Sequence, residues 1–156
     1  MHRRNILSAA FTVACATPPI TPMLMERAEA QARAAQAAVD ASKVVYHLSD
    51  LDKVDFVLGN IHNHYAGVGG PDHVRIALVV HGPALKAFHL AGAAPDVSKR
   101  LEELRQLGLA PMACINTMRA QNVTLKDLLP GFGVADKGGV VRLAELQAQG
   151  YAYLRP

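Results

Sequence analysis

The stretch Val74-Arg75-Ile76-Ala77-Leu78-Val79-Val80-His81-Gly82-Pro83 decides the fold class of this sequence. Its first seven residues are apolar except for Arg75. Such a nearly continuous apolar run is typical of a central strand in a parallel sheet, because helices cover both faces of that strand. Gly82 and Pro83 end the run, since neither residue suits a strand interior. The sequence therefore predicts a buried parallel strand with His81 just beyond its carboxyl end.

Strand and helix patterns alternate on both sides of this run. Before it, residues 43–48 form a short β-branched run, and Ser49 is predicted to cap a helix that continues at helical spacing to Tyr65. After it, the predicted elements follow in chain order: a short helix at 84–90, a helix capped by Asp96 and ended by Gly108, a strand at 110–115, a helical turn at 125–129, a brief strand at 132–134, a helix at 138–149 and a strand at 151–154. This alternation predicts an α/β fold with an open, mainly parallel sheet of five strands and helices on both of its faces.

Polar and nucleophilic residues follow three of the predicted strands. In sheets of this kind, ligands bind beyond the carboxyl ends of the strands. The first strand ends at His47, the second at His81, and the third at Cys114, with Asn116 and Thr117 directly after it. A reactive thiolate needs a lowered pKa, which a nearby histidine or backbone amides at a strand end can supply. We therefore expect a site with Cys114 as nucleophile and His81 as its base or hydrogen-bond donor, supported by the other three residues.

These residues also have plainer interpretations. A lone cysteine is most often a small buried hydrophobe, and a histidine at a strand end is often satisfied by the backbone. A metal site of His47, His81 and Cys114 would suit zinc or copper. Its three ligands would come from separate strands without any spacing signature, so neither a metal nor a cofactor is predicted.

Several other charged residues are interpreted as peripheral. The histidines at 62, 64 and 73 are expected on the surface, and His89 near a helix end is expected to interact with the helix dipole. Arg119 and Arg142 could bind an anion near Cys114 if folding brings them there.

Four segments of residues 43–156 resemble the DsrE/DsrF-like family of small sulfur-relay proteins. The segments are His47-Leu48-Ser49-Asp50, Val79 to Ala84, Ala113 to Met118 running on to Asp127-Leu128-Leu129-Pro130-Gly131, and Gly138 to Leu143 together with Gln149 to Pro156. The resemblance implies a flavodoxin-like three-layer α/β sandwich that assembles as trimers or hexamers. It also implies a cysteine that carries sulfur as a persulfide, and Cys114 falls in the matching stretch.

Composition excludes several classes of protein. The chain has 156 residues and a net charge of +3, from 16 Lys+Arg against 13 Asp+Glu. This charge is too small and too dispersed for a nucleic-acid footprint. No apolar run reaches the length of a permanent membrane span, about 18 residues or more. The two cysteines, Cys15 and Cys114, exclude a disulfide-rich scaffold.

Residues 1–32 have the pattern of an export signal. Arg3 and Arg4 precede a mostly apolar stretch at 6–16, and Ala-x-Ala cleavage sites lie at 28–32. The start resembles a twin-arginine signal, and the general export route is the alternative. We therefore expect a periplasmic protein, with residues 33–42 as an Ala-rich linker or helix. Two alternatives stay open: a lipid anchor on Cys15, and an Ala-rich helix at 26–41 retained in the mature protein.

The predicted function is that of an exported DsrE-like, sulfurtransferase-like carrier that binds or relays sulfane sulfur as a persulfide on Cys114. Its partners would be copies of itself and a sulfur donor or acceptor protein. The alternative is a non-catalytic oligomeric module, an accessory of a periplasmic redox complex, in which Cys114 is structural. A binder of small molecules or metals at the same edge is a third interpretation. Apolar residues in 84–94 predict an exposed patch that forms the interface of a trimer or hexamer.

Overall fold

A computed structural model describes residues 25–27, 29–31 and 41–156. The chain divides into two compact units, residues 1–34 and 35–156. In the first unit, residues 25–27 and 29–31 are helical and exposed. Cys15, most of the predicted export signal and residues 33–40 of the predicted linker lie outside the described residues.

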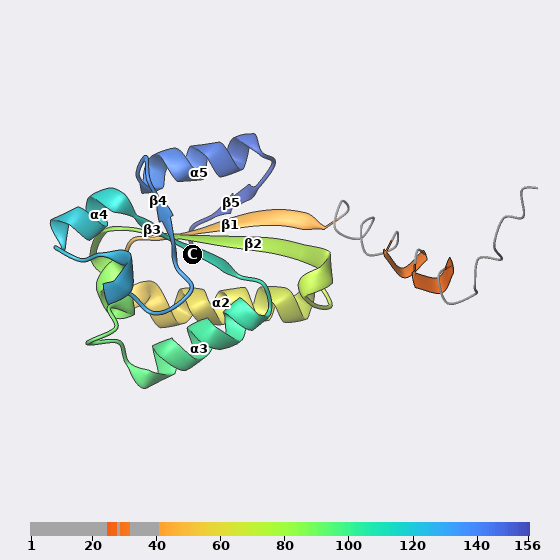
Figure 1. Cartoon of the computed structure of the whole chain (residues 1–156), viewed down its shortest axis with the longest axis horizontal. Coiled ribbons are helices and arrows are strands. Elements are labelled where there is room, and N and C mark those ends of the chain that lie inside the picture. Colours follow the sequence, from red (N-terminus) through yellow and green to blue (C-terminus); the bar gives the residue numbers. More distant parts are fainter. Residues whose placement is uncertain (1–24, 28, 32–40) are drawn as a thin grey trace, which may run out of the picture. The chain divides into compact units, whose positions relative to one another are not determined.

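The second unit contains a sheet of five strands, all of them parallel to their neighbours. The strands are β1 Ser42–Leu48, β2 Val74–Val80, β3 Ala110–Cys114, β4 Gly133–Ala135 and β5 Ala152–Leu154. Their order across the sheet is β4-β3-β2-β1-β5 (Figure 1). The predicted α/β fold is confirmed, and the sheet is wholly parallel.

Helices cover both faces of this sheet. The long helices α2 Val54–Gly67 and α3 Pro95–Gln106 pack side by side on one face, and α5 Gly139–Ala148 covers the other (Figure 1). The short helix α4 Ile115–Ala120 follows β3 directly. The arrangement is the predicted three-layer sandwich, and four of the five strands precede α5 in the chain.

The two faces of the sheet form cores of unequal size. The larger core packs β1 and β2 residues such as Leu78 against α2 and α3. On the other face, Val45, Ala77 and Val79 pack against Leu143 and Leu146 of α5. Side chains alternate between the faces of a strand, so residues two positions beyond Val45 and Val79 continue the thinner, α5 side. This side therefore carries the polar ends of the strands.

The central strand β2 has the burial that its sequence predicted. All of its residues are buried except Arg75. Neighbouring strands lie on both of its edges and helices on both of its faces. Apolar side chains that point to either face of β2 are therefore removed from water.

Two predicted helix caps are wrong. Ser49 does not cap a helix: Asp50 precedes a short 3₁₀ turn at Leu51–Lys53 without any side-chain cap, and the Ser49 hydroxyl instead accepts a hydrogen bond from Arg155. Asp96 lies inside the first turn of α3, which starts at Pro95. Proline suits that first position because its missing N–H would have no partner in the helix.

The predicted elements around the site also differ in detail. The third strand ends at Cys114, and Ile115 already begins α4. The predicted helix at 84–90 is a 3₁₀ helix, Gly82–Phe88.

The predicted apolar surface patch at 84–94 is wrong. Leu85 and Phe88 are completely buried in the larger core, where Phe88 packs edge-on against Phe132. Only Leu90 among the large apolar residues of this segment is exposed. The apolar residues of the segment therefore serve the core of the domain.

Candidate active site

The carboxyl ends of β1, β2 and β3 bring the predicted residues to one edge of the sheet. His47 pairs in register with Val79, and Val79 pairs with Met112. His81 and Cys114 each follow two residues later on their strands, so all three side chains face α5. The strands β2 and β3 are neighbours in the sheet, which places His81 and Cys114 side by side along its edge.

The Cys114 thiol lies between the starts of two helices. Cys114 is buried and is the residue that precedes α4, while the backbone N–H of Gly139, the first residue of α5, donates to its Sγ at 3.1 Å. Burial raises the pKa of the thiol. Hydrogen bonds from the amides of Thr117, Gly139 and Asn116 and from the Thr117 hydroxyl outweigh burial, so the pKa lies below its ordinary value.

Glycines permit the close approach of α5 to this thiol. A Cβ at Gly139 would lie 3.3 Å from the Cβ of Cys114 and 3.4 Å from the Cβ of His81. Gly138 has φ +100°, a conformation that side chains rarely adopt, and a Cβ there would lie 2.9 Å from Nδ2 of Asn116. A larger residue at either position would move α5 away from the sulfur.

Thr117 links the thiol to the end of β2. Its Oγ1 accepts a hydrogen bond from the Gly82 amide at 2.9 Å, which leaves the hydroxyl hydrogen free for Cys114. The Gly82 carbonyl accepts from Gln121 Nε2 at 2.9 Å, and Gln121 Oε1 is hydrogen-bonded to His89 Nε2 at 2.8 Å. His89 therefore holds the loop in place through Gln121, which the sequence interpretation missed.

His47 and His81 form a hydrogen-bonded pair through their Nε2 atoms. Their rings are stacked, with centroids 4.6 Å apart. Nδ1 of His47 is hydrogen-bonded to the Tyr153 hydroxyl at 2.6 Å. Burial lowers the pKa of both imidazoles, to about 4 for His47, where the charge of His81 lowers it further. Both rings are therefore neutral at pH 7, so one Nε2 donates and the other accepts in this hydrogen bond.

Tyr153 and Arg155 also act on this histidine pair, and the sequence did not predict their role. Arg155 Nη2 donates to Ser49 Oγ at 3.1 Å and to Asp50 Oδ2 at 3.4 Å. The guanidinium charge also lowers the pKa of both histidines, and the Asp50 carboxylate opposes it. Tyr153 lies in β5 and Arg155 follows two positions later, so both side chains are expected on the same face of the sheet. Only the strand order, with β5 beside β1, shows that this face adjoins His47.

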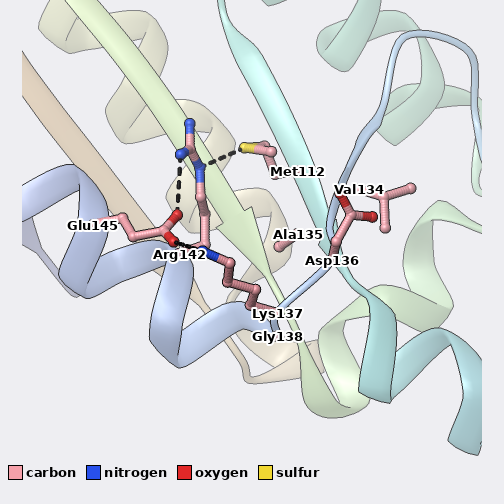
Figure 2. Close-up of a pocket in the computed structure, with 8 residues that line it drawn as sticks. All are labelled: Met112, Val134, Ala135, Asp136, Lys137, Gly138, Arg142 and Glu145. Atoms are coloured by element: carbon pink, nitrogen blue, oxygen red, sulfur yellow. Dashed lines mark hydrogen bonds and ion pairs between the residues drawn. The ribbon is translucent and has the colours of Figure 1, made fainter.

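Two cavities adjoin each other along the start of α5. The first, about 170 Å³, is lined by His81, Cys114, Asn116 and the first turn of α5. The second, about 290 Å³, is lined by Met112, Asp136, Arg142 and Glu145 among others (Figure 2). Lys137 and Gly138 line both. The first cavity has room for a few atoms of ligand beside a nucleophile of lowered pKa.

The remaining predicted residues have mixed outcomes. Arg142 lines the second cavity and Arg119 is exposed, and neither of them lines the Cys114 cavity. His62 and His73 are exposed as predicted. The surface interpretation of His64 is wrong, because its ring is half-buried and hydrogen-bonded to the Tyr46 hydroxyl at 3.0 Å.

Two negative findings apply to the described residues alone. Within them, no group of three or more His, Cys, Asp or Glu side chains is arranged to hold a metal ion. Nor does any helix in that part of the chain have the length and apolar character needed to cross a membrane.

The sequence model of the DsrE/DsrF-like family matches residues 25–156. No curated protein matches the chain. The protein of unknown function MTH1491 from Methanobacterium thermoautotrophicum is 30% identical with a TM-score of 0.65, and the match covers 74% of this chain and 99% of that one.

Two further solved structures share the fold. The conserved protein of unknown function BT1422 from Bacteroides thetaiotaomicron is 20% identical with a TM-score of 0.56, covering 77% of this chain and 97% of that one. The ychN protein from E. coli is 13% identical with a TM-score of 0.53, covering 74% and 99%.

Proposed function

The chain belongs to the DsrE/DsrF-like family, and from this membership we propose that it binds and relays sulfane sulfur as a persulfide on Cys114. One observation carries the proposal: the Cys114 sulfur lies against amides at the starts of α4 and α5 and lines a small cavity. These amides stabilise a thiolate, which is the nucleophilic form of cysteine.

The transfer step needs no cofactor. The Cys114 thiolate attacks the outer sulfur of a donor persulfide R–S–SH, a new S–S bond forms on Cys114, and the donor's S–S bond breaks. The products are Cys114–S–SH and the donor thiolate R–S⁻, so sulfur atoms, electrons and charge balance. The same step run against an acceptor thiolate returns the sulfur. The backbone N–H groups around Sγ stabilise the Cys114 thiolate, both before it attacks the donor and after it has passed the sulfur to an acceptor.

His81 is the proposed proton acceptor and donor of the site. It lines the Cys114 cavity, and its lowered pKa keeps it neutral at pH 7. Its Nε2 is engaged by His47, and its Nδ1 has no hydrogen-bond partner within residues 41–156. A proton taken at Nδ1 from a thiol in the cavity makes His81 an imidazolium, and the hydrogen between the two Nε2 atoms can then pass to His47. Release to the thiol runs the same two transfers in reverse, and the Tyr153 hydroxyl holds His47 in place through its Nδ1.

The alternative function is a binding module in which Cys114 is structural. The burial of Cys114 favours it, since its exposed fraction is 6%. A structural cysteine would be expected in an apolar shell. The polar donors around Sγ and the adjoining cavity instead favour the carrier.

Export to the periplasm and assembly into a homo-oligomer are parts of the same proposal. Export is supported by the arginines, apolar stretch and Ala-x-Ala sites within residues 1–32. Assembly is supported by the implication of the family resemblance and by exposed apolar side chains beside the site, Val140 and Val141.

Mass spectrometry of the intact protein after incubation with inorganic polysulfide tests the carrier function. We expect a gain of about 32 Da on Cys114, one sulfur atom, that dithiothreitol removes. Both proteins carry Cys15→Ala, so that Cys114 is the single cysteine tested, and the Cys114→Ser variant should show no gain. An unchanged mass of the protein that keeps Cys114, or a gain that persists in the serine variant, would reject the carrier function and favour the structural alternative.

A further inference from the structure

The second cavity, about 290 Å³ in volume, lies next to the Cys114 cavity and has no role in the sulfur transfer described above (Figure 2). We propose that it binds the α-amino-acid end of a small aminothiol or its persulfide, with the carboxylate on Arg142 and the ammonium on Asp136. This inference rests on the proposed function and names the chemical class of its donor or acceptor.

Arg142 enters the cavity with most of its hydrogen-bonding capacity unused. Its Nε donates to the Met112 thioether at 3.1 Å, and its Nη1 donates to Glu145 Oε2 at a long 3.4 Å. A thioether is a weak acceptor, and a guanidinium carries five N–H donors. The side chain is only 28% exposed, so water does not fully replace the missing acceptors. A ligand carboxylate would accept two of these donors side by side.

Glu145 is shared between two cations, so it does not fully neutralise the Arg142 guanidinium. Its other oxygen, Oε1, accepts from Lys137 Nζ at 3.1 Å. One carboxylate therefore serves two cations, and Arg142 holds the longer of the two contacts. The group of Lys137, Arg142 and Glu145 keeps one net positive charge, which favours an anionic ligand group beside Arg142.

Asp136 supplies the opposite charge at the rim of the cavity. Figure 2 shows Asp136 and the Arg142 guanidinium on opposite sides of Met112, and Asp136 is exposed. Asp136 forms no ion pair within residues 41–156. A ligand with a carboxylate alone would face this unpaired charge, whereas an α-amino acid presents an ammonium to it. Ala135, which pairs in register with Cys114, completes the wall.

The position of the cavity directs such a ligand toward Cys114. Met112 and Cys114 are two residues apart on β3, about 7 Å, and both side chains face α5. A short side chain attached to the anchored α-carbon can extend from beside Met112 along Lys137 and Gly138, which line both cavities. With a cysteine-like persulfide, Cys114 takes the outer sulfur by the balanced step given above, and the amino-acid thiolate leaves.

Binding is tested on the full-length protein with S-methyl-L-cysteine, which has no thiol and undergoes no exchange. Methionine methyl groups are labelled with ¹³C, and the Met112 signal, assigned with Met112→Leu, reports on the cavity. We expect a saturable shift with S-methyl-L-cysteine. 3-(Methylthio)propanoate, which lacks the ammonium, and 2-(methylthio)ethylamine, which lacks the carboxylate, should each bind at least about tenfold more weakly.

The two charge variants should change the binding of different ligands, which a general loss of structure would not do. Arg142→Gln should weaken S-methyl-L-cysteine by about tenfold or more, and Asp136→Asn should weaken it while leaving 3-(methylthio)propanoate binding equal or tighter. Arg119→Gln, at an exposed arginine of α4, is the matched control and should change neither. Equal binding of the amino acid and the propanoate to the wild type, or the absence of saturation at about 10 mM, would overturn the inference.

Failure of this inference and failure of the proposed function are distinguishable. Cys114→Ser should still bind S-methyl-L-cysteine, because Cys114 does not line this cavity. Arg142→Gln should still gain sulfur from inorganic polysulfide, which has no amino-acid end. Probe binding without sulfur gain rejects the carrier alone, and sulfur gain without probe binding rejects the amino-acid site alone.

Discussion

The thiol of Cys114 is subject to two opposing effects on its pKa. Burial favours the neutral thiol, and four hydrogen-bond donors, two of them from Thr117, favour the thiolate and outweigh burial. The hydroxyl of Thr117 is the one donor among them that can be removed without moving the backbone. Its Oγ1 is already held by the Gly82 amide, so its hydrogen is directed to the sulfur.

We therefore expect Thr117→Val to raise the pKa of Cys114 and to slow its alkylation by iodoacetamide at pH 7. A rise of one pKa unit lowers the thiolate fraction about tenfold. Thr117→Ser keeps the hydroxyl and should retain the wild-type rate. The measurement is the alkylation rate against pH, with urea unfolding to confirm that the variants are folded. Equal pH midpoints for the valine and serine variants would mean that the hydroxyl does not act on the thiolate.

The histidine pair predicts how stability depends on pH. His47 takes up a proton at its ordinary pKa of 6.5 in the unfolded chain, and only at about 4 in the folded protein. Between these values the unfolded state binds more protons, so the free energy of unfolding falls as the pH is lowered from about 6.5 to about 4. His81 contributes in the same direction.

Urea unfolding between pH 4 and pH 7, a range set by the proton linkage of these histidines, measures this slope. His47→Gln should flatten it, even though the variant is less stable at pH 7 through loss of the bonds to His81 and Tyr153. His62→Gln, at an exposed position of α2, should leave the slope unchanged. If the glutamine at position 47 retained the full slope, other groups would have to account for it.

The sequence located the ends of the strands, and with them His47, His81 and Cys114. The apolar run of β2 and the rule for parallel sheets were sufficient for this, because both depend on local pattern. Tyr153 and Arg155 could not be found in this way. Their contacts with His47 and Asp50 arise because β5 pairs with β1 at the edge of the sheet, and strand order is a property of the whole chain.

The segment after β2 shows why the apolar pattern of residues 84–94 led to a wrong prediction of an exposed patch. Alanines together with Leu85 and Phe88 resemble an exposed apolar patch when no partner is known. In the structure, the 3₁₀ helix Gly82–Phe88 packs Leu85 and Phe88 into the larger core. The backbone N–H of Leu129 donates to the Phe88 carbonyl there at 2.8 Å. The partner residues come from 128–132, forty or more positions later in the sequence, so no local pattern can reveal them.

The start of α5 is the element on which the thiol depends most directly. We expect Gly139→Ala to displace this helix, since the new Cβ would crowd Cys114 and His81. The N–H···Sγ bond should lengthen and the thiol pKa should rise, with a loss of stability of about 1–3 kcal/mol, typical of overpacking.

The measurements are the alkylation rate against pH and the urea midpoint. Gly67→Ala, at the last residue of α2, is the matched control: a Cβ there meets nothing within 4 Å, so it should change neither the thiol nor, beyond a small gain, the stability. An alanine at 139 that left the alkylation profile unchanged would show that the α5 amide is unimportant to the thiolate.

The exposed apolar side chains of the folded unit indicate where copies of the chain would meet. Val140 is 71% exposed at the first turn of α5, and Val141 beside it also lines the Cys114 cavity. We expect sedimentation at micromolar concentration to give a multiple of the 16.7 kDa chain mass, a trimer or a hexamer. Val140→Asp should weaken this assembly, because it places a charge in an apolar contact.

Phe56→Asp is the control for assembly. Phe56 is also exposed, but it lies on α2, on the opposite face of the sheet from α5 (Figure 1). This variant should assemble as the wild type does. A monomer at all concentrations would contradict the assembly, and equal weakening by both variants would contradict its assignment to α5.

Export predicts how the chain is shortened in its host. Cleavage after Ala30 or Ala32 would leave Gln31 or Arg33 as the first residue, which N-terminal sequencing of the native protein measures. Among the described residues, every buried one lies at Ala41 or later, so the chain beginning at residue 33 should unfold at the same urea concentration as the full-length chain. It should also keep the alkylation rate of Cys114, since all the hydrogen-bond donors to that sulfur lie between residues 116 and 139. A native protein that begins at Met1 or carries a lipid on Cys15 would contradict cleavage, and a lower urea midpoint of the shortened chain would show that residues 1–32 stabilise the fold.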